Sequence, residues 1–130
     1  MTSTGSPLRS DVVSLEPQGI KGVACRVCSR RSFPERPLCP HCGADAVDNV
    51  MMAGRGRIVS WTVVHQAPPP LQTPYTLVTV DLDDGVRLLG AATGAVEIDD
   101  EVAVELFTLK ADSSGEPLWW YRFRGTEENR

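Results

Sequence analysis

Four cysteines, arranged as two C-x2-C pairs, constrain the fold of this chain more than any other feature. They are its only cysteines, and all lie in the stretch CRVCSRRSFPERPLCPHCG, residues 25–43. Each pair can form a tight turn that presents two thiolates on one side, and two such turns facing each other make a tetrahedral sulfur cage. The cage would consist of Cys25, Cys28, Cys39 and Cys42. The spacing therefore predicts a metal-binding module that either zinc or iron would satisfy.

A cage closed by four thiolates has no open position for water or substrate, so the sequence predicts a structural metal and not a catalytic one. Metal-binding cysteines are typical of a reducing compartment. The first residues, MTSTGSPLRSD, show no charged-then-apolar signal pattern, and no apolar run approaches the about 18 residues that would span a bilayer. We therefore expect a cytoplasmic protein that does not act at a membrane.

Beyond the cysteine module the pattern changes to short apolar strands separated by turn residues. The predicted strands are GRIVSWTVVH (56–65), YTLVTVDL (75–82), VRLLGAAT (86–93), EVAVELF (101–107) and LWWYRF (118–123). The four prolines of APPPLQTP, residues 67–74, exclude a strand interior there. DDG at 83–85 predicts a tight hairpin turn. Five strands and no convincing helix predict a small barrel, for which the OB-fold is the natural candidate.

The predicted fold class is therefore mostly β, with an N-terminal metal ribbon followed by a five-stranded OB-fold barrel. The expected parts are a flexible leader, the ribbon, the barrel and a disordered tail, over residues 1–17, 18–52, 53–125 and 126–130. The leader contains one short apolar stretch, Val12, Val13 and Leu15, that could dock on another element.

Charge is unevenly distributed along the chain. The net charge is −4, yet the segment from Lys21 to Arg57 has seven basic and three acidic residues. A basic patch on an acidic protein could hold a phosphate-bearing ligand, but it could equally be a solvated face.

The sequence offers no catalytic set. With the four cysteines committed to a metal, only His41 and His65 remain as imidazole bases. The chain has no Gly-rich phosphate loop, no serine nucleophile elbow and no H-E-x-x-H motif. We therefore predict no catalytic residues, and a chain that is no enzyme by itself.

The order of these motifs resembles one known family. The cysteine stretch, followed by GRGRIVSWTVVHQAPPPLQTPYTLVTVDLDDGVRLLG, is similar to the acyl-CoA-associated family that joins a rubredoxin-like zinc ribbon to an OB-fold. The resemblance covers residues 20 to about 107. Its most specific part is the first barrel strand with the proline run behind it, because zinc knuckles alone are widespread.

The resemblance implies a function as well as a fold. Members of the family are non-catalytic partners of thiolase-like subunits, of lipid-transfer-type aldolase subunits or of hydratases. By analogy, this chain would bind structural zinc and dock on a thiolase-fold enzyme, in a heterotetramer. It would complete the channel for a coenzyme A thioester and be a required subunit for carbon–carbon bond cleavage or formation. Steroid side-chain and aromatic catabolism are both compatible with the resemblance.

The resemblance also assigns surface residues. Side chains of the first barrel strand and the following loop would lie near the acyl-CoA or the partner; these are Trp61, His65, Pro68, Pro69, Pro70 and Tyr75. Arginines of the basic segment could meet the phosphates of coenzyme A as charge-assisted pairs. The candidates are Arg30, Arg31, Arg55 and Arg57. On the last strand, Trp120 faces away from Trp119 and Tyr121, which makes it an interface candidate.

Two other classes of function are compatible with the motifs. OB-folds often bind single-stranded nucleic acid, but from residue 58 onward this chain has five basic and twelve acidic residues. That charge disfavours a nucleic-acid partner. A rubredoxin-like electron carrier would use the same four cysteines with iron, and a metal analysis would distinguish it from a zinc protein.

Overall fold

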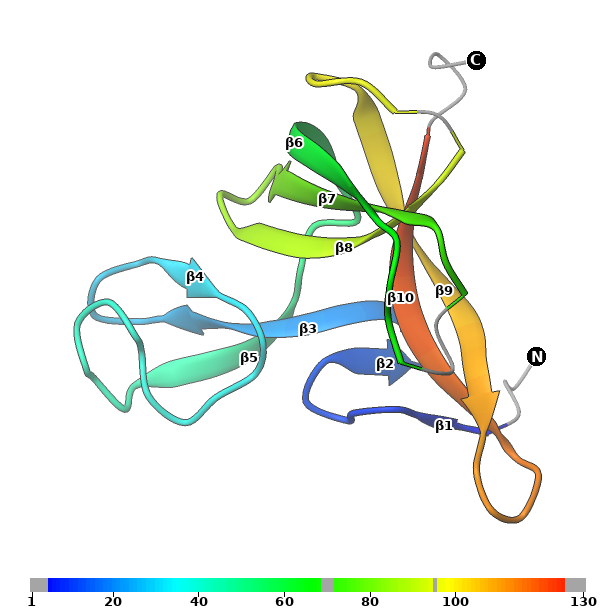
Figure 1. Ribbon diagram of the computed structural model, residues 1–130. Coiled ribbons are helices and arrows are strands. Elements are labelled where there is room, and N and C mark those ends of the chain that lie inside the picture. Colours follow the sequence, from blue (N-terminus) through cyan, green and yellow to red (C-terminus); the bar gives the residue numbers. More distant parts are fainter. Residues whose placement is uncertain (1–4, 69–71, 95, 126–130) are drawn as a thin grey trace.

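A computed structural model describes residues 5–68, 72–94 and 96–125. All regular structure in these residues is β-strand, so none of them belongs to a helix that could cross a membrane. The strands are β1 (Ser6–Pro7), β2 (Val13–Leu15), β3 (Gln18–Cys25), β4 (Arg31–Ser32), β5 (Val47–Met51), β6 (Arg55–Val64), β7 (Tyr75–Leu82), β8 (Arg87–Thr93), β9 (Glu101–Ala111) and β10 (Pro117–Gly125). Figure 1 shows a small ribbon built around β3, β4 and β5 beside a larger set of long, crossing strands.

The long strands form a closed five-stranded barrel. Their order is β6–β7–β8–β10–β9, and β9 pairs again with β6. All of these pairs are antiparallel except β8–β10, which is parallel at Phe123↔Ala92 and Arg124↔Thr93. The mostly-β class and the five-stranded OB-fold barrel predicted from the sequence are therefore confirmed.

Alternation along the strands fills the barrel. On β7, Val78, Val80 and Leu82 are buried while the residues between them are only partly covered. Because side chains of a strand point alternately to its two faces, one face of β7 supplies the core. Phe123 of β10 is fully buried among them. Its ring requires glycine on the neighbouring strand, since a Cβ at Gly90 would lie 2.8 Å from the Phe123 ring.

In the ribbon, β3 is the central strand. It pairs antiparallel with β2, β4 and β5. β3 ends at Cys25, so the strand that organises the ribbon also delivers the first cysteine.

The N-terminal segment differs from the flexible leader expected for residues 1–17. β1 pairs in parallel with β10, and β2 pairs with β3. Val12 and Val13 are buried in the same core cluster as Ile20 and Met52. Burial of these two valines holds the segment in place, because it removes apolar surface from water that a loose leader would leave exposed. The expected disordered tail, residues 126–130, lies outside the described residues.

The ribbon is packed against the barrel through aromatic and polar contacts. The ring of Phe33, just after β4, meets the ring of Tyr121 edge-on, with centroids 5.9 Å apart. Within the barrel, the Tyr121 hydroxyl donates a hydrogen bond to the carbonyl of Leu89. The second link between the two parts is Asp84, in the β7–β8 turn. Its carboxylate lies 3.9 Å from Arg31 of the ribbon and accepts the backbone N–H of Ala53, in the connection between ribbon and barrel, at 2.7 Å.

Candidate functional site

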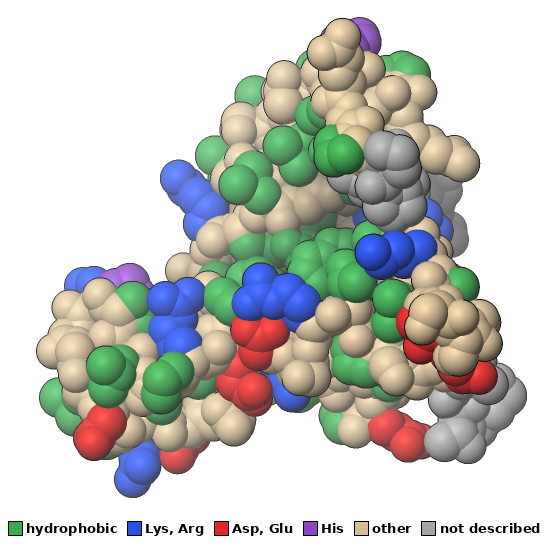
Figure 2. Space-filling model, turned by 60° about the horizontal axis from the view of Figure 1, so that its bottom comes forward, with side chains coloured by type: hydrophobic (Ala, Val, Ile, Leu, Met, Phe, Trp, Pro, Cys, Tyr) green, Lys and Arg blue, Asp and Glu red, His purple; other side chains and the backbone are tan. Residues whose placement is uncertain are grey.

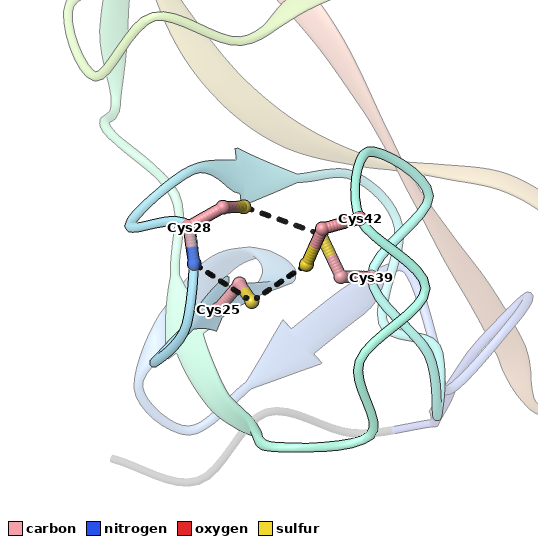
Figure 3. A group of neighbouring side chains, drawn as sticks. All are labelled: Cys25, Cys28, Cys39 and Cys42. Carbon is pink, nitrogen blue, oxygen red and sulfur yellow. Dashed lines mark hydrogen bonds between the residues drawn. The ribbon is translucent and has the colours of Figure 1, made fainter.

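The four cysteines meet at one point, as the sequence predicts. Cys25 and Cys28 come from the turn after β3, and Cys39 and Cys42 come from a second turn before β5. Figure 3 shows their sulfurs pointing toward one another. All four Sγ atoms lie within 4.8 Å of one another, and the Cys25–Cys42 and Cys28–Cys39 pairs are both 3.6 Å apart. Four sulfurs at about 2.3 Å from one tetrahedral zinc ion would be about 3.8 Å apart, so the cage fits such an ion.

Backbone amides of the two turns point at the sulfurs. The N–H groups of Val27 and Cys28 donate to Cys25 Sγ at 3.3 and 3.5 Å, and His41 N–H donates to Cys39 Sγ at 3.4 Å. The Cys28 amide is the main reason that the pKa of the Cys25 thiol falls to about 6. Hydrogen bonds to the charged form favour a thiolate, the protonation state that a metal requires.

The cage is suited to structure rather than to chemistry. Cys25 and Cys39 are buried, and four protein ligands complete a tetrahedral site. His41 is exposed and is not part of the cage; its Nδ1 lies 3.4 Å from Arg30 Nη1. What the ribbon offers to other molecules is therefore the surface around the cage.

The four candidate arginines lie in two separate places, and only one pair forms a cationic cavity. Arg30 and Arg31 follow the first cysteine turn, where they line a cavity of about 450 Å³ together with His41 and Asp84. Arg31 is only loosely paired with Asp84, at 3.9 Å. The guanidinium groups of Arg30 and Arg31 are therefore open to a bound anion.

Arg55 and Arg57 lie at the start of β6 and already have partners. Arg55 forms an ion pair with Glu101 at 3.6 Å, and Arg57 donates to the carbonyl of Asp99 at 3.1 Å. The cavity beside Arg57 is also lined by Asp81 and Asp83. This second place is less suited to phosphate, since three aspartates line it beside one arginine, against one aspartate beside two arginines in the first cavity.

The candidates from the first barrel strand lie toward the C-terminal end of β6 and the N-terminal end of β7. Trp61 is 47% exposed and pairs across the sheet with Val78, while Tyr75 pairs with Val64. His65 and Pro68 follow β6 and are exposed. The predicted Pro69 and Pro70 lie outside the described residues. Trp61 and Tyr75 are thus on adjacent strands, near the same end of the barrel.

Trp120 is less outward than the sequence suggests. It is half-buried and packs against the core cluster, with its ring centroid 5.0 Å from that of Tyr121. Strong twist along a barrel strand lets neighbouring side chains approach each other, which simple alternation does not anticipate. Its role at an interface stays a prediction.

The sequence interpretation missed Asp84. It predicted a turn residue in DDG, and Asp84 does lie in that turn, but its side chain also contacts the hinge and the ribbon. The second carboxylate oxygen is buried without a hydrogen-bond partner among the described residues. No sequence signal could have revealed this, because the same turn motif commonly carries solvent-exposed aspartates.

One face of the molecule has a hollow at its middle, beside the ribbon. Figure 2 shows hydrophobic side chains gathered in this hollow, with the ribbon as the lobe on the left and Lys or Arg side chains along the border. An apolar hollow with a cationic border is suited to a ligand that has an apolar part and an anionic part.

The fold and the cage define a protein that joins a four-cysteine metal ribbon to an OB-fold. Two family models match it in this order: the rubredoxin-like zinc ribbon domain of ChsH2 over residues 15–48, and the C-terminal OB-fold domain of ChsH2 over residues 49–107. The chain belongs to this ChsH2 zinc-ribbon and OB-fold family, and the predicted resemblance is confirmed.

Individual relatives agree with the family. A DUF35 domain-containing scaffold protein of Pyrococcus furiosus is 34% identical over 99 residues, covering 71% of this chain and 73% of the relative. The benzoylsuccinyl-CoA thiolase subunit BbsA of Thauera aromatica is 31% identical over 108 residues, covering 81% and 75%. A chain in the solved structure of the Ltp2-ChsH2(DUF35) aldolase superposes with a TM-score of 0.67 at 30% identity, covering 85% of this chain and 87% of that one.

Proposed function

We propose that this chain is a non-catalytic accessory subunit that docks on a thiolase-fold acyl-CoA enzyme and completes its acyl-CoA channel. Its relatives include a scaffold protein, a thiolase subunit and a chain of a solved aldolase, which supports an accessory role. The observation that carries the acyl-CoA part is the apolar hollow with its cationic border. The partner would be a retro-aldolase or a thiolase, in a heterotetramer, in the cytoplasm.

Within this proposal the two ends of an acyl-CoA have different sites. The apolar acyl group would lie in the hollow. The phosphates of the nucleotide end would lie in the cavity of Arg30, Arg31 and His41, since a phosphate can replace the loose Arg31–Asp84 pair with a stronger charge-assisted one. Arg55 and Arg57 are less suitable because both already have partners.

The ribbon would carry structural zinc in this function. Zinc would hold the turn after Cys28 in place and with it Arg30 and Arg31, so the metal would position the phosphate site without touching the ligand. Purified protein should contain one zinc per chain by elemental analysis. A red protein with iron in place of zinc would support the rubredoxin-like electron carrier instead.

The decisive experiment is co-expression with a thiolase-fold subunit. The chain should co-purify with that subunit at a fixed ratio, and the pair should cleave or form the carbon–carbon bond of a bulky acyl-CoA, of the steroid side-chain or aromatic type. The partner alone should be much less active. Equal activity of the partner with and without this chain would refute the proposal.

The phosphate site has its own test within the same complex. Arg31→Gln should raise the KM for the acyl-CoA about tenfold and leave kcat nearly unchanged, because a lost phosphate contact weakens binding uniformly. The matched control is Arg57→Gln, whose guanidinium lies in the acid-lined place and should have little effect on KM. Equal effects of both substitutions would argue against the assignment.

A further inference from the structure

The outer half of β6, residues 59–64, has an open edge. The pairing of β6 with β9 ends at Arg57, and two more backbone bonds join Ile58 to Asp99 and Asp100. Beyond Ile58, β6 pairs only with β7 among the described residues. Hydrogen-bonding direction alternates along a strand, so every second residue of this stretch turns its N–H and C=O away from β7.

Both faces of this stretch are partly uncovered as well as its edge. Ser60, Trp61, Thr62 and Val63 are all exposed, with Trp61 at 47% and Val63 at 39%. Successive side chains of a strand point to opposite faces, so four exposed residues in a row mean that neither face is fully covered by the described residues. A small ligand could cover one face, but only another macromolecule could cover two faces and an edge.

The stretch carries neither charge nor proline, and its one protective device is a β-bulge at Val59, between Ile58 and Ser60. Between Arg57 and Asp81 the sequence contains no Asp, Glu, Lys or Arg, although 23% of the chain is charged. Other strands that border open sheet edges carry such protection: β1 has a proline, β5 an aspartate and β8 an arginine. An uncharged, β-branched edge promotes strand pairing with another chain unless a partner covers it.

We propose that residues 59–64 of β6 are a docking edge, to which an extended segment of the partner enzyme adds as an extra strand. This inference rests on the proposed function for the nature of the partner and adds where and how it docks. Backbone hydrogen bonds would provide the register, and uncharged partner side chains would cover Trp61 and Val63. A lipid surface is a poorer occupant, because interfacial segments carry Lys or Arg beside their apolar residues and this one has none.

Hydrogen exchange of the free chain and of the complex with its thiolase-fold partner tests the docking edge directly. In the free chain, the amides within residues 59–64 that turn away from β7 should exchange faster than those of the buried β7 partner residues such as Val78. In the complex, these outward amides should become protected at least tenfold. Slow exchange of the outward amides in the free chain would show that the edge is already paired and would overturn the inference without any partner.

A substitution pair separates edge docking from general surface effects. Val63→Lys places a charge on the open edge and should weaken partner binding by about tenfold or more, measured by titration calorimetry. The matched control is Leu89→Lys on β8, since Leu89 is also an exposed aliphatic residue, at 56% against 39% for Val63. It should bind like the unmodified chain. Val63→Thr keeps strand propensity without charge and should retain most of the affinity.

The remaining outcomes are also decisive. If the complex forms but Val63→Lys binds as well as Leu89→Lys, the docking edge is wrong while the accessory function stands. If no thiolase-fold subunit binds the unmodified chain, both fail. Binding of the free chain to phosphatidylcholine vesicles, lost in Val63→Lys, would assign this stretch to a lipid surface and overturn the inference.

Discussion

The ribbon and the barrel are stabilised by different means. Large apolar side chains fill the barrel, where Val78, Val80, Val102 and Phe123 are all fully buried. Around the cage, the buried residues are mainly Val23 and the two cysteines Cys25 and Cys39. Burial of apolar area can support the barrel, whereas the cysteine end of the ribbon has too little of it. We therefore expect this end to depend on metal binding for its folding energy.

The junction between the ribbon and the barrel is stabilised in the same way as the barrel, by burial of apolar side chains. Val12, Val13, Ile20 and Met52 come from the N-terminal and ribbon strands, yet they are part of one core cluster with Phe123. The base of the ribbon should therefore remain attached to the barrel even when its metal end is unfolded.

The largest expected effect is loss of the cage. Zinc binding contributes apparent free energies of about 10–16 kcal/mol in isolated zinc fingers, so Cys39→Ser or chelation should unfold the metal end of the ribbon. Amide exchange should show lost protection around Cys25 and retained protection of β7.

His41→Ala is the control for this experiment, since His41 lies next to Cys42 but outside the cage. It should keep one metal per chain and the exchange pattern of the unmodified protein. Simultaneous loss of protection in β7 and around Cys25 would mean that the barrel also depends on the metal. It would contradict the statement that ribbon and barrel are stabilised by different means.

The next effect concerns the barrel alone. Phe123→Ala leaves a cavity at a fully buried position and should lower the free energy of unfolding by about 3–5 kcal/mol in urea titrations. Metal affinity should change little. Trp61→Ala also removes an aromatic ring, but from an exposed site, so it should cost less than about 1 kcal/mol. Similar losses of unfolding free energy in both variants would show that burial in the core is not what stabilises the barrel.

The same contrast explains what the sequence could predict. Cysteine spacing predicts the cage because a metal site needs few ligands at fixed separations, and the four sulfurs do lie within 4.8 Å of one another. The barrel strands follow from apolar runs between turn signals, and β7 has the predicted bounds, Tyr75–Leu82. Local patterns were sufficient in both cases.

Features that depend on distant contacts were not predictable. β1 and β2 are too short to give a periodic signal, and only their pairing with β10 and β3 makes them strands. The separation of Arg31 from Arg57 likewise depends on how the ribbon packs on the barrel. A count of charges along the sequence places them in a single basic segment, whereas the fold places Arg31 beside the Asp84 carboxylate and Arg57 beside the backbone carbonyl of Asp99.

Tyr121, at the junction, gives a smaller and pH-dependent effect. Burial raises the pKa of Tyr121 to about 12, above the usual value near 10. Because the folded state holds this proton more tightly, its contribution is complete below about pH 10 and is lost as the pH rises toward 12. The loss should be about 3 kcal/mol, since each pKa unit corresponds to about 1.4 kcal/mol, measured as the difference in unfolding free energy between the unmodified chain and Tyr121→Phe. A constant difference across this range would contradict the burial of the hydroxyl.

The smallest effect measures the coupling of ribbon to barrel. Edge-on aromatic pairs contribute about 0.5–1.5 kcal/mol beyond their buried area, so Phe33→Leu and Tyr121→Leu should be non-additive by that amount in a double-mutant cycle. Phe33→Leu combined with Ile98→Ala, an exposed site outside the core cluster, should be additive. Because Phe33 follows the first cysteine turn, the coupling should vanish when the metal is removed. Coupling that persists in the metal-free protein would show that the spacer between the cysteine pairs is held by the barrel and not by the cage.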